Sequence, residues 1–434
     1  MKPIYQNQLP SGWHERPLKD AIVRRRGYSW EKSQETAVPE NGSTPVIRIP
    51  NIQDELDLRD TLYLRNVPPE ALETSGVTKN WILYVGSNGN PERIGDSVLI
   101  SQDRPMVFAS FLQGITSKDS TEILPEFLAQ WMRLHNVHQT FSKTSQQTTG
   151  LANFAWSAVK RLPFRYPDDI EEQRMIVTAL SHVQDLITAA QQHLSAAQRI
   201  KTALMQQLFT TGMPGRHKQF KETKIGKVPE KWDVVQLKNL LTSSQYGLSE
   251  SFSQRGQHQI LRMMNIEDGF VHTRDPVYID LDETTYQNYR LEVGDILFNR
   301  TNSLELVGRV GIVRDRFEAV FASYLVRLKA NTEKVDPFFL NYCLNSYRVK
   351  CRYRRFATPA VGQANISPRN LKTTLIAIPK RESGEQEDIV QLISECDQVI
   401  EATTKKQNAL VLLKKSLLQN LLTGKVRVNM EAQA

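Results

Sequence analysis

The chain has 434 residues, of which 40% are apolar and 24% are charged. This length allows two or three domains with separate cores, and the composition is that of a globular protein. No run approaches the roughly 18 apolar residues that a membrane-spanning helix needs, so we expect no membrane partner. The N-terminus lacks the apolar core of a secretory signal, which predicts a cytoplasmic protein.

The cysteines and the net charge further limit the class of protein to which the chain can belong. Cys343, Cys351 and Cys396 are odd in number and include no CxxC pair, so neither a disulfide framework nor a structural zinc site is expected. The net charge is +8 and the pI is about 9.2. This excess suits a polyanionic partner such as DNA but does not identify one.

The chain contains an internal repeat of about half its length. The offset between matching positions drifts from 219 (229 − 10) to 212 (362 − 150), as small insertions would cause. The order of the anchors is the same in both halves, whereas the intervening sequence has diverged. The matching anchors are Pro10 and Trp13 with Pro229 and Trp232, Arg48, Asn51 and Ile52 with Arg262, Asn265 and Ile266, Ala109 to Phe111 with Ala322 to Tyr324, and Gly150, Ala152 and Asn153 with Gly362, Ala364 and Asn365.

Each half ends in a segment with a heptad-like apolar seam, which predicts two helices of about 40 residues. Asp169 with Glu172 and Ser383 with Gln386 have the spacing of capping boxes. Burial of each stripe against its own domain is the alternative, but the matching phase favours an antiparallel coiled coil that acts as a spacer. The seam comprises Ile176, Leu180, Val183, Ile187, Ala190, Leu194, Ala197, Leu204 and Leu208, and the positions 213 later, with Lys201 and Lys414 at the one missing step of each.

The globular halves are predicted to be β-rich with a few short helices, which gives an α+β fold. The expected domains are residues 1–168, a long helix in 169–215, residues 216–381, and a second long helix with a tail in 382–434. The expected strands are Val46 to Ile49, Ser97 to Ile100, Asp295 to Phe298, Arg309 to Val313 and Tyr324 to Leu328, and the expected short helices are Glu126 to His135 and Phe338 to Tyr347.

Two clusters in the second half have the chemistry of DNA contacts. Lys350, Arg352, Arg354 and Arg355 alternate with aromatic residues and could neutralise phosphates, although a solvated helix face is the alternative. The run Asn299, Arg300, Thr301 and Asn302 follows a predicted strand, and Arg and Asn side chains read guanine and adenine in the major groove.

The first half offers a weaker candidate. Lys143, Gln146, Gln147 and Thr148 provide hydrogen-bonding groups before Gly150, but a plain linker explains them equally well. The three adjacent arginines at 24 to 26 suggest phosphate or surface charge, because they cannot all face one groove. The repeated polar positions Arg48, Asn51, Asn153, Arg262, Asn265, Gly362, Gln363 and Asn365 complete the set of candidate DNA-binding residues.

No catalytic motif is present. The chain has no phosphate-binding GxxxxGK[ST] loop, GxGxxG, HExxH, GxSxG or Asn-Pro-Pro-aromatic sequence. We therefore expect no catalytic centre and no bound metal or cofactor.

The repeated layout resembles the specificity subunits of type I restriction-modification enzymes. The resemblance covers essentially the whole chain and rests on Pro-x-x-Trp at the start of each half, on residues 294–300, and on 362–367 followed by Ile378-Pro379 and Glu385-Gln386. The first half lacks an evident counterpart of 299–302 and offers Ser101 to Arg104 instead.

The resemblance implies that each domain reads one half of a bipartite DNA site. It also implies that the helices bind two modification (methyltransferase) subunits, which recruit restriction subunits. S-adenosylmethionine, ATP and magnesium would belong to those partners. The alternatives are a self-contained nuclease or methyltransferase, and a coiled-coil scaffold that does not read DNA.

Overall fold

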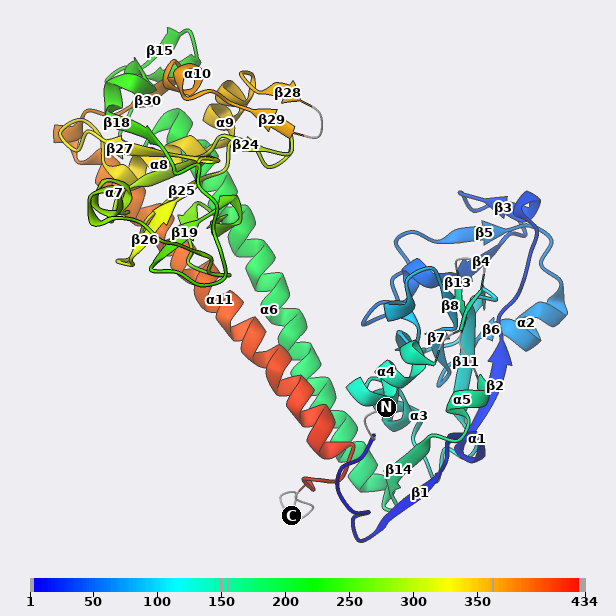
Figure 1. Ribbon diagram of the computed structural model, residues 1–434. Coiled ribbons are helices and arrows are strands. Elements are labelled where there is room, and N and C mark those ends of the chain that lie inside the picture. Colours follow the sequence, from blue (N-terminus) through cyan, green and yellow to red (C-terminus); the bar gives the residue numbers. More distant parts are fainter. Residues whose placement is uncertain (1–3, 145, 149–150, 154–155, 361–362, 429–434) are drawn as a thin grey trace. The chain divides into compact units, whose positions relative to one another are not determined.

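The computed structural model describes residues 4–144, 146–148, 151–153, 156–360 and 363–428. The chain divides into two compact units (Figure 1). The first unit comprises residues 1–191 and 405–434, and the second comprises residues 192–404. Each long helix therefore contributes one half to each unit, so neither unit consists of one sequence repeat alone.

The first unit is built on short strands with helices at their edges. Its larger sheets have the strand orders β3-β5-β4-β10-β6 and β2-β11-β7-β9, while β1 pairs with β14 and β8 joins β13 and β12. The strands are β1 (Trp13–Pro17), β2 (Ile22–Arg26), β3 (Glu35–Thr36), β4 (Thr44–Ile47), β5 (Leu62–Leu64), β6 (Gly76–Val77), β7 (Ile82–Val85), β8 (Ser87–Asn88), β9 (Ser97–Leu99), β10 (Arg104–Phe108), β11 (Leu112–Ser117), β12 (Gln146–Thr148), β13 (Leu151–Asn153) and β14 (Pro163–Pro167). The short helices are α1 (Leu18–Ala21), α2 (Pro69–Ser75), α3 (Pro125–Met132), α4 (His135–Lys143) and α5 (Trp156–Val159).

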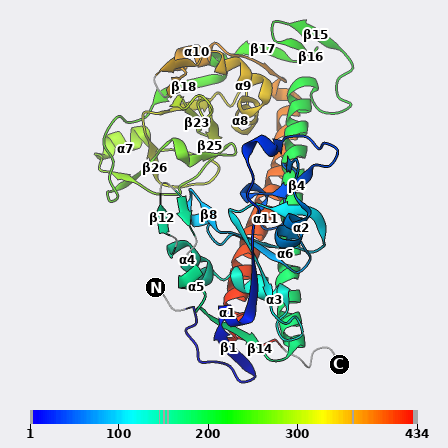
Figure 2. The same cartoon turned by 90° about the vertical axis from the view of Figure 1, so that its right-hand side faces the viewer.

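Aromatic side chains fill the core of the first unit. Trp131 and Phe164 are fully buried, with ring centroids 5.1 Å apart in an edge-to-face arrangement. The hydroxyl of Tyr5 accepts hydrogen bonds from the Trp131 indole at 2.8 Å and from the Arg165 backbone N–H at 3.0 Å. Trp13 of β1 belongs to the same core as Ile176 of the long helix, and Figure 2 shows β1 and β14 beside the helices. These contacts fix the N-terminal segment to the start of that helix.

The second unit repeats this design. A six-stranded sheet has the order β18-β27-β23-β25-β21-β20, and the smaller sheets are β22-β19-β26, β24-β29-β28, β17-β30 and β15-β16. The strands are β15 (Phe220–Thr223), β16 (Gly226–Pro229), β17 (Asp233–Gln236), β18 (Leu241–Tyr246), β19 (His258–Leu261), β20 (Ile266–Glu267), β21 (Phe270–Val271), β22 (Tyr278–Ile279), β23 (Ile296–Asn299), β24 (Thr301–Asn302), β25 (Val310–Ile312), β26 (Ala319–Phe321), β27 (Leu325–Ala330), β28 (Thr358–Ala360), β29 (Gln363–Asn365) and β30 (Leu375–Ile378). The short helices are α7 (Glu283–Tyr289), α8 (Pro337–Asn345), α9 (Tyr347–Arg354) and α10 (Pro368–Lys372).

The expected elements are present, with boundaries shifted by a few residues. The five expected strands correspond to β4, β9, β23, β25 and β27, and the two expected short helices correspond to α3 and α8. The structure confirms the α+β class and the repeat. The helix pair α3–α4 in the first unit has its counterpart in α8–α9 of the second.

The two long helices are α6 (Ile170–Thr211) and α11 (Glu385–Leu421). Their pairing is antiparallel in each unit. In the first unit Gln184 accepts a hydrogen bond from Lys414, and in the second Lys201 forms an ion pair with Asp397 at 2.5 Å. The two lysines that interrupt the seam therefore make polar contacts across the helix pair.

The helix starts differ from the expected capping boxes. Asp169 does accept a hydrogen bond from the backbone N–H of Glu171 at 2.8 Å, but Glu172 pairs with Arg427 beyond the end of α11. The amide of Gln386 donates to the carbonyl of Pro379 at 2.9 Å instead of completing a cap with Ser383. Tertiary partners thus replace the local bonds that the spacing predicts.

Candidate nucleic-acid interface

A small three-stranded sheet, called the hairpin below, brings together the polar runs of the second unit. Strand β24 pairs with β29 in the register Thr301 to Asn365 and Asn302 to Ala364, and β29 pairs in turn with β28. The hairpin extends from the body of the second unit (Figure 1). Residues about 60 positions apart in the sequence, including Gln363, therefore lie in one small sheet. Gly362, which the sequence analysis included, lies outside the described residues.

Arg300 lies at the base of this hairpin. Its guanidinium lies 5.1 Å from the centroid of the Tyr246 ring and donates to the Ser323 carbonyl at 3.4 Å. Tyr246 is half-exposed, so the stacked guanidinium remains beside solvent. Asn299 is fully buried, and neither atom of its amide has a partner among the described residues. The two neighbours therefore differ in solvent access, because Arg300 is partly exposed whereas Asn299 is buried in the sheet, and a role of either in DNA contact stays a prediction.

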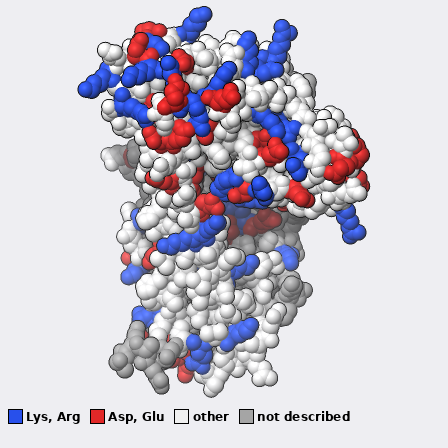
Figure 3. All heavy atoms as spheres, turned by 90° about the vertical axis from the view of Figure 1, so that its left-hand side faces the viewer, with Lys and Arg blue, Asp and Glu red and all other residues white. Residues whose placement is uncertain are grey.

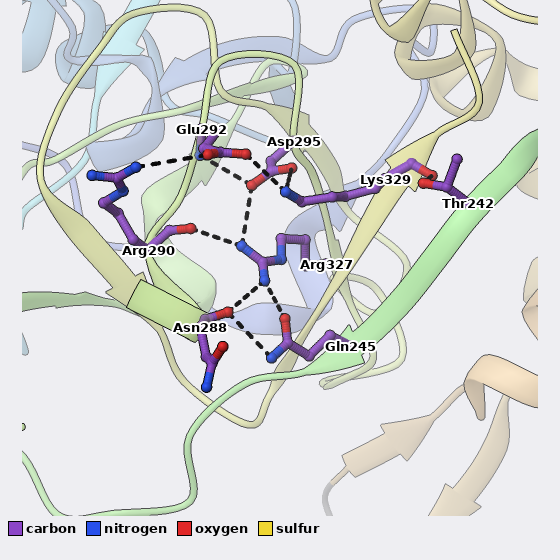
Figure 4. A network of polar contacts seen from close by, with 8 residues as sticks. All are labelled: Thr242, Gln245, Asn288, Arg290, Glu292, Asp295, Arg327 and Lys329. Carbon is purple, nitrogen blue, oxygen red and sulfur yellow. Dashed lines mark hydrogen bonds and ion pairs between the residues drawn. The ribbon is translucent and has the colours of Figure 1, made fainter. Parts of the chain in front are cut away.

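A buried ion network holds the opposite end of β23 (Figure 4). The Arg327 guanidinium pairs with Asp295 at 3.4 Å and donates to the carbonyls of Arg290 at 2.7 Å and Asn288 at 2.7 Å. It also donates to the side chain of Gln245 in β18. Burial raises the pKa of the Asp295 carboxyl, while the neighbouring Arg327 and Lys329 oppose that rise. This network connects β18, β27 and the segment before β23, and so fixes the strand that leads to Arg300.

The repeated Arg-x-x-Asn motif forms the same turn in both units. The Asn51 side chain accepts from the backbone N–H of Arg48 at 2.7 Å, and Asn265 does so from Arg262 at 2.8 Å. Both asparagines are buried, and their amide nitrogens donate to backbone carbonyls of the following loop. The arginine side chains reach the backbone of Asp60 and Asp275, respectively. In this structure the four residues hold a turn, and a role in DNA contact stays a prediction.

The basic run on α9 is divided between different faces of the helix. Arg352 donates to the carbonyls of Leu375 and Ile225, and Arg354 donates to the carbonyls of residues 304, 305 and 307. Lys350 lines a different cleft, beside Arg309 and α6, and burial lowers its pKa. Arg355 is exposed. Only part of the run is therefore free to meet a ligand.

The first unit contains the same hairpin from different residues. Gln146 pairs with Asn153, Gln147 with Ala152, and β13 pairs in turn with Ser87 and Asn88 of β8. Lys143, at the end of α4, is exposed. The hairpin order β12-β13-β8 corresponds to β28-β29-β24 of the second unit.

This hairpin corrects one expectation about the first half. The counterpart of Thr301 and Asn302 is Ser87 and Asn88, which follow β7, and not the segment Ser101 to Arg104. Gly86 stands where the second unit has Arg300. The sequence signal was weak because the arginine is absent and only the asparagine is kept. In this unit a different guanidinium, that of Arg24, lies over an aromatic ring, 4.0 Å from the centroid of Trp156.

Charge is mixed over the face drawn in Figure 3. Lys and Arg side chains are interspersed with Asp and Glu over the upper part of this view. Within the described ranges, no group of three or more His, Cys, Asp or Glu residues could hold a metal ion. No helix among the described residues is both long and apolar enough to cross a membrane.

Two globular domains of one design, each with a polar hairpin, define the class of the protein as a duplicated recognition module. The sequence matches the type I restriction modification DNA specificity domain twice, over residues 10–198 and 229–412. The chain belongs to this family.

Two of the following three similar proteins cover nearly the whole chain. The EcoKI specificity subunit of Escherichia coli K12 is 22% identical, covering 98% of this chain and 91% of the relative. The putative MjaX specificity subunit of Methanocaldococcus jannaschii is 31% identical over about half of each chain, 48% and 49%. The S subunit of a type I system from M. genitalium has the same fold, with a TM-score of 0.60 at 12% identity, covering 99% of this chain and 100% of that one.

Proposed function

We propose that this chain is the non-catalytic subunit that reads a bipartite DNA sequence for a type I restriction-modification complex, with one half-site read by each unit. The observation that carries the proposal is the repeated hairpin. Thr301 and Asn302 in the second unit and Ser87 and Asn88 in the first occupy equivalent strands with similar side chains. Around them the residues differ, because Arg300 and Gln363 of the second unit stand where the first has Gly86 and Leu151. A common scaffold with different polar groups suits two different base sequences, because base edges are distinguished by hydrogen-bonding side chains.

Mapping of methylated adenines in cells that carry the complete system tests this proposal. We expect a single two-part motif with a fixed gap. Exchange of residues 220–380 for the same region of a relative should change only one part of that motif. Changes in both parts, or methylation without any bipartite motif, would contradict the proposal that each unit reads one half-site.

The proposal includes two modification subunits, which dock on the long helices. Each unit exposes apolar helix residues that cost free energy in water and suit a protein partner. Leu186 and Leu413 are 49% and 46% exposed in the first unit. Their counterparts 213 positions away, Val399 (186 + 213) and Ile200 (413 − 213), are 55% and 61% exposed in the second. Two equivalent patches suit two copies of one partner.

Native mass spectrometry of the assembled complex tests this docking. Leu186→Ser with Leu413→Ser should leave one modification subunit bound in place of two, because the second-unit patch is intact. Leu72→Ser, an exposed leucine of α2, is the matched control and should leave both subunits bound. Retention of both subunits by the double variant would exclude this patch.

The remaining parts of the proposal concern the partners. S-adenosylmethionine, ATP and magnesium would be bound by the modification and restriction subunits, and the complex would act on DNA in the cytoplasm. The purified chain alone should neither methylate nor cleave DNA. Either activity in the isolated chain would favour an enzyme instead.

A further inference from the structure

The second unit has a cleft of about 590 Å³ beside α9. Its walls are formed by one side of α9, by the turn between β15 and β16, and by the connection from α10 to β30. The cleft is lined by Lys224, Ile225, Tyr347, Arg348, Cys351, Arg352, Arg355, Phe356, Thr373, Thr374 and Leu375.

The charges in this cleft are of one sign. Lys224, Arg348, Arg352 and Arg355 line it, and no described Asp or Glu does. None of these four cations forms an ion pair with a carboxylate of the described residues, in contrast to Lys329 or Arg314 of the same unit. A concentration of unpaired cations in a concave surface attracts anions strongly.

One of the four cations is held rigidly, and the other three are free. The Arg352 guanidinium donates to the carbonyls of Leu375 at 3.1 Å and Ile225 at 3.3 Å, which orients it in the cleft wall. Burial lowers its pKa, and the nearby Arg348 and Arg355 act in the same direction. Lys224, Arg348 and Arg355 are exposed. The cluster thus has one fixed and three adaptable donors.

The scaffold does not require these cations. Helix α4 of the first unit is the counterpart of α9, with Val137 and Phe141 buried at the positions of Val349 and Tyr353 (349 − 137 = 212). At the same offset, Asn136 and Thr140 stand in place of Arg348 and Arg352. The core-facing side of the helix is preserved, while two of the three arginines have neutral counterparts and only Arg355 corresponds to a cation, Lys143 (355 − 212).

We infer that this cleft binds phosphodiester groups of duplex DNA outside the base-reading hairpin, as an anchor that is more strongly charged in the second unit than on the corresponding helix of the first. The inference rests on the proposed function. Arg355 and Phe356 line the cleft and β28 of the hairpin begins at Thr358, so one residue separates the cleft from the recognition strands. Tyr347, 74% exposed, adds an aromatic surface against which a sugar can pack. Several separate cations suit a chain of phosphates better than a single small anion.

The test uses the full chain assembled with its modification subunits. Lys224→Gln, Arg348→Gln and Arg355→Gln are combined, and Arg352 is left in place because its bonds hold two backbone segments. The control combines Lys231→Gln, Lys238→Gln and Arg255→Gln, which are exposed, unpaired cations of the same unit outside the cleft. Affinity for a fluorescent duplex of random sequence is measured against salt concentration.

The cleft variant should flatten the slope of log affinity against log salt by about 2 to 3, because each phosphate contact releases about 0.9 counterions. The control variant should keep the wild-type slope. The methylated motif in cells should be the same in both, since phosphate contacts carry no base information.

Other outcomes would overturn the inference. An unchanged slope with the methylated motif intact would reject the cleft as a DNA anchor and leave the proposed function standing. Loss of inorganic pyrophosphate binding with no change in DNA slope would identify a small-anion site instead. Loss of poly-glutamate binding alone would identify an acidic protein partner. Absence of DNA affinity and of any methylated motif in the wild-type complex would reject the proposed function itself.

Discussion

The carboxylate of Glu385 accepts a hydrogen bond from the indole Nε1 of Trp232 at 3.0 Å, and both side chains are almost fully buried. The same carboxylate accepts the backbone N–H of Met213 at 2.9 Å and contacts His217 at 2.8 Å. One side chain at the start of α11 therefore joins the end of α6 to the opening of the second globular domain.

Glu385→Ala should destabilise the second unit by about 3 kcal/mol, because it leaves a buried indole N–H and a part-buried backbone N–H without acceptors. Chemical denaturation of the full chain, followed by Trp fluorescence, measures this loss. Glu172→Ala is the matched change in the first unit and should cost less, since its partner Arg427 is half-exposed and can be solvated. Equal losses in the two variants would contradict this account.

Arg327→Met should destabilise the second unit by about 3 to 5 kcal/mol, because it leaves the Asp295 carboxylate buried without its main counter-charge. Lys329→Met removes a more exposed partner of the same network and should cost less than about 1 kcal/mol. Thermal unfolding compares the two. The double variant Arg327→Met with Asp295→Leu should recover much of the lost stability. If it does not, the loss in Arg327→Met comes from disturbed packing and not from the unpaired carboxylate.

Arg300→Ala should relax base preference at one position of one half-site and cost about 1 to 3 kcal/mol of discrimination. Mapping of methylated adenines shows the relaxed position, and binding to matched and altered duplexes gives the free energy. Tyr246→Leu keeps the arginine but removes the ring beneath it, so we expect a smaller effect at the same position. Equal weakening of binding to every DNA sequence would indicate that Arg300 contacts a phosphate and not a base.

The paired helices are predicted to set the gap between the half-sites. Leu180 and Ile393 are fully buried in the two cores, so the deletion must avoid them. Removal of residues 188–194 together with 404–410 keeps the seam in phase and shortens the pair by about 10 Å. The mapped motif should keep its halves and lose about three base pairs of gap at ~3.4 Å per base pair.

A three-residue deletion, of 188–190 alone, is the control for the spacer. It shifts the seam of α6 against α11 and should prevent assembly with the modification subunits. A heptad-deleted protein that assembles and methylates at the original gap would show that the helices do not set the spacing.

The sequence alone determined the repeat, the two long helices and the resemblance to a DNA specificity family. These features depend on local periodicity and on anchors such as Trp13 and Trp232, whose order survives divergence. A helical seam is read from residues three and four apart, so no long-range information is needed. Even the polar interruptions Lys201 and Lys414 were visible as breaks in that pattern.

Only the tertiary structure decided how the candidate site is assembled. Strand register depends on hydrogen bonds between distant segments, so the pairing of Thr301 with Asn365, and of Ser87 with Asn153, could not be read from composition. The same reason explains why the first half was expected to lack a counterpart of the second-unit run and to offer Ser101 to Arg104 instead. Which cations of α9 stay free was likewise set by carbonyls of segments distant in the sequence, which bind Arg352 and Arg354 and leave Arg355 to solvent.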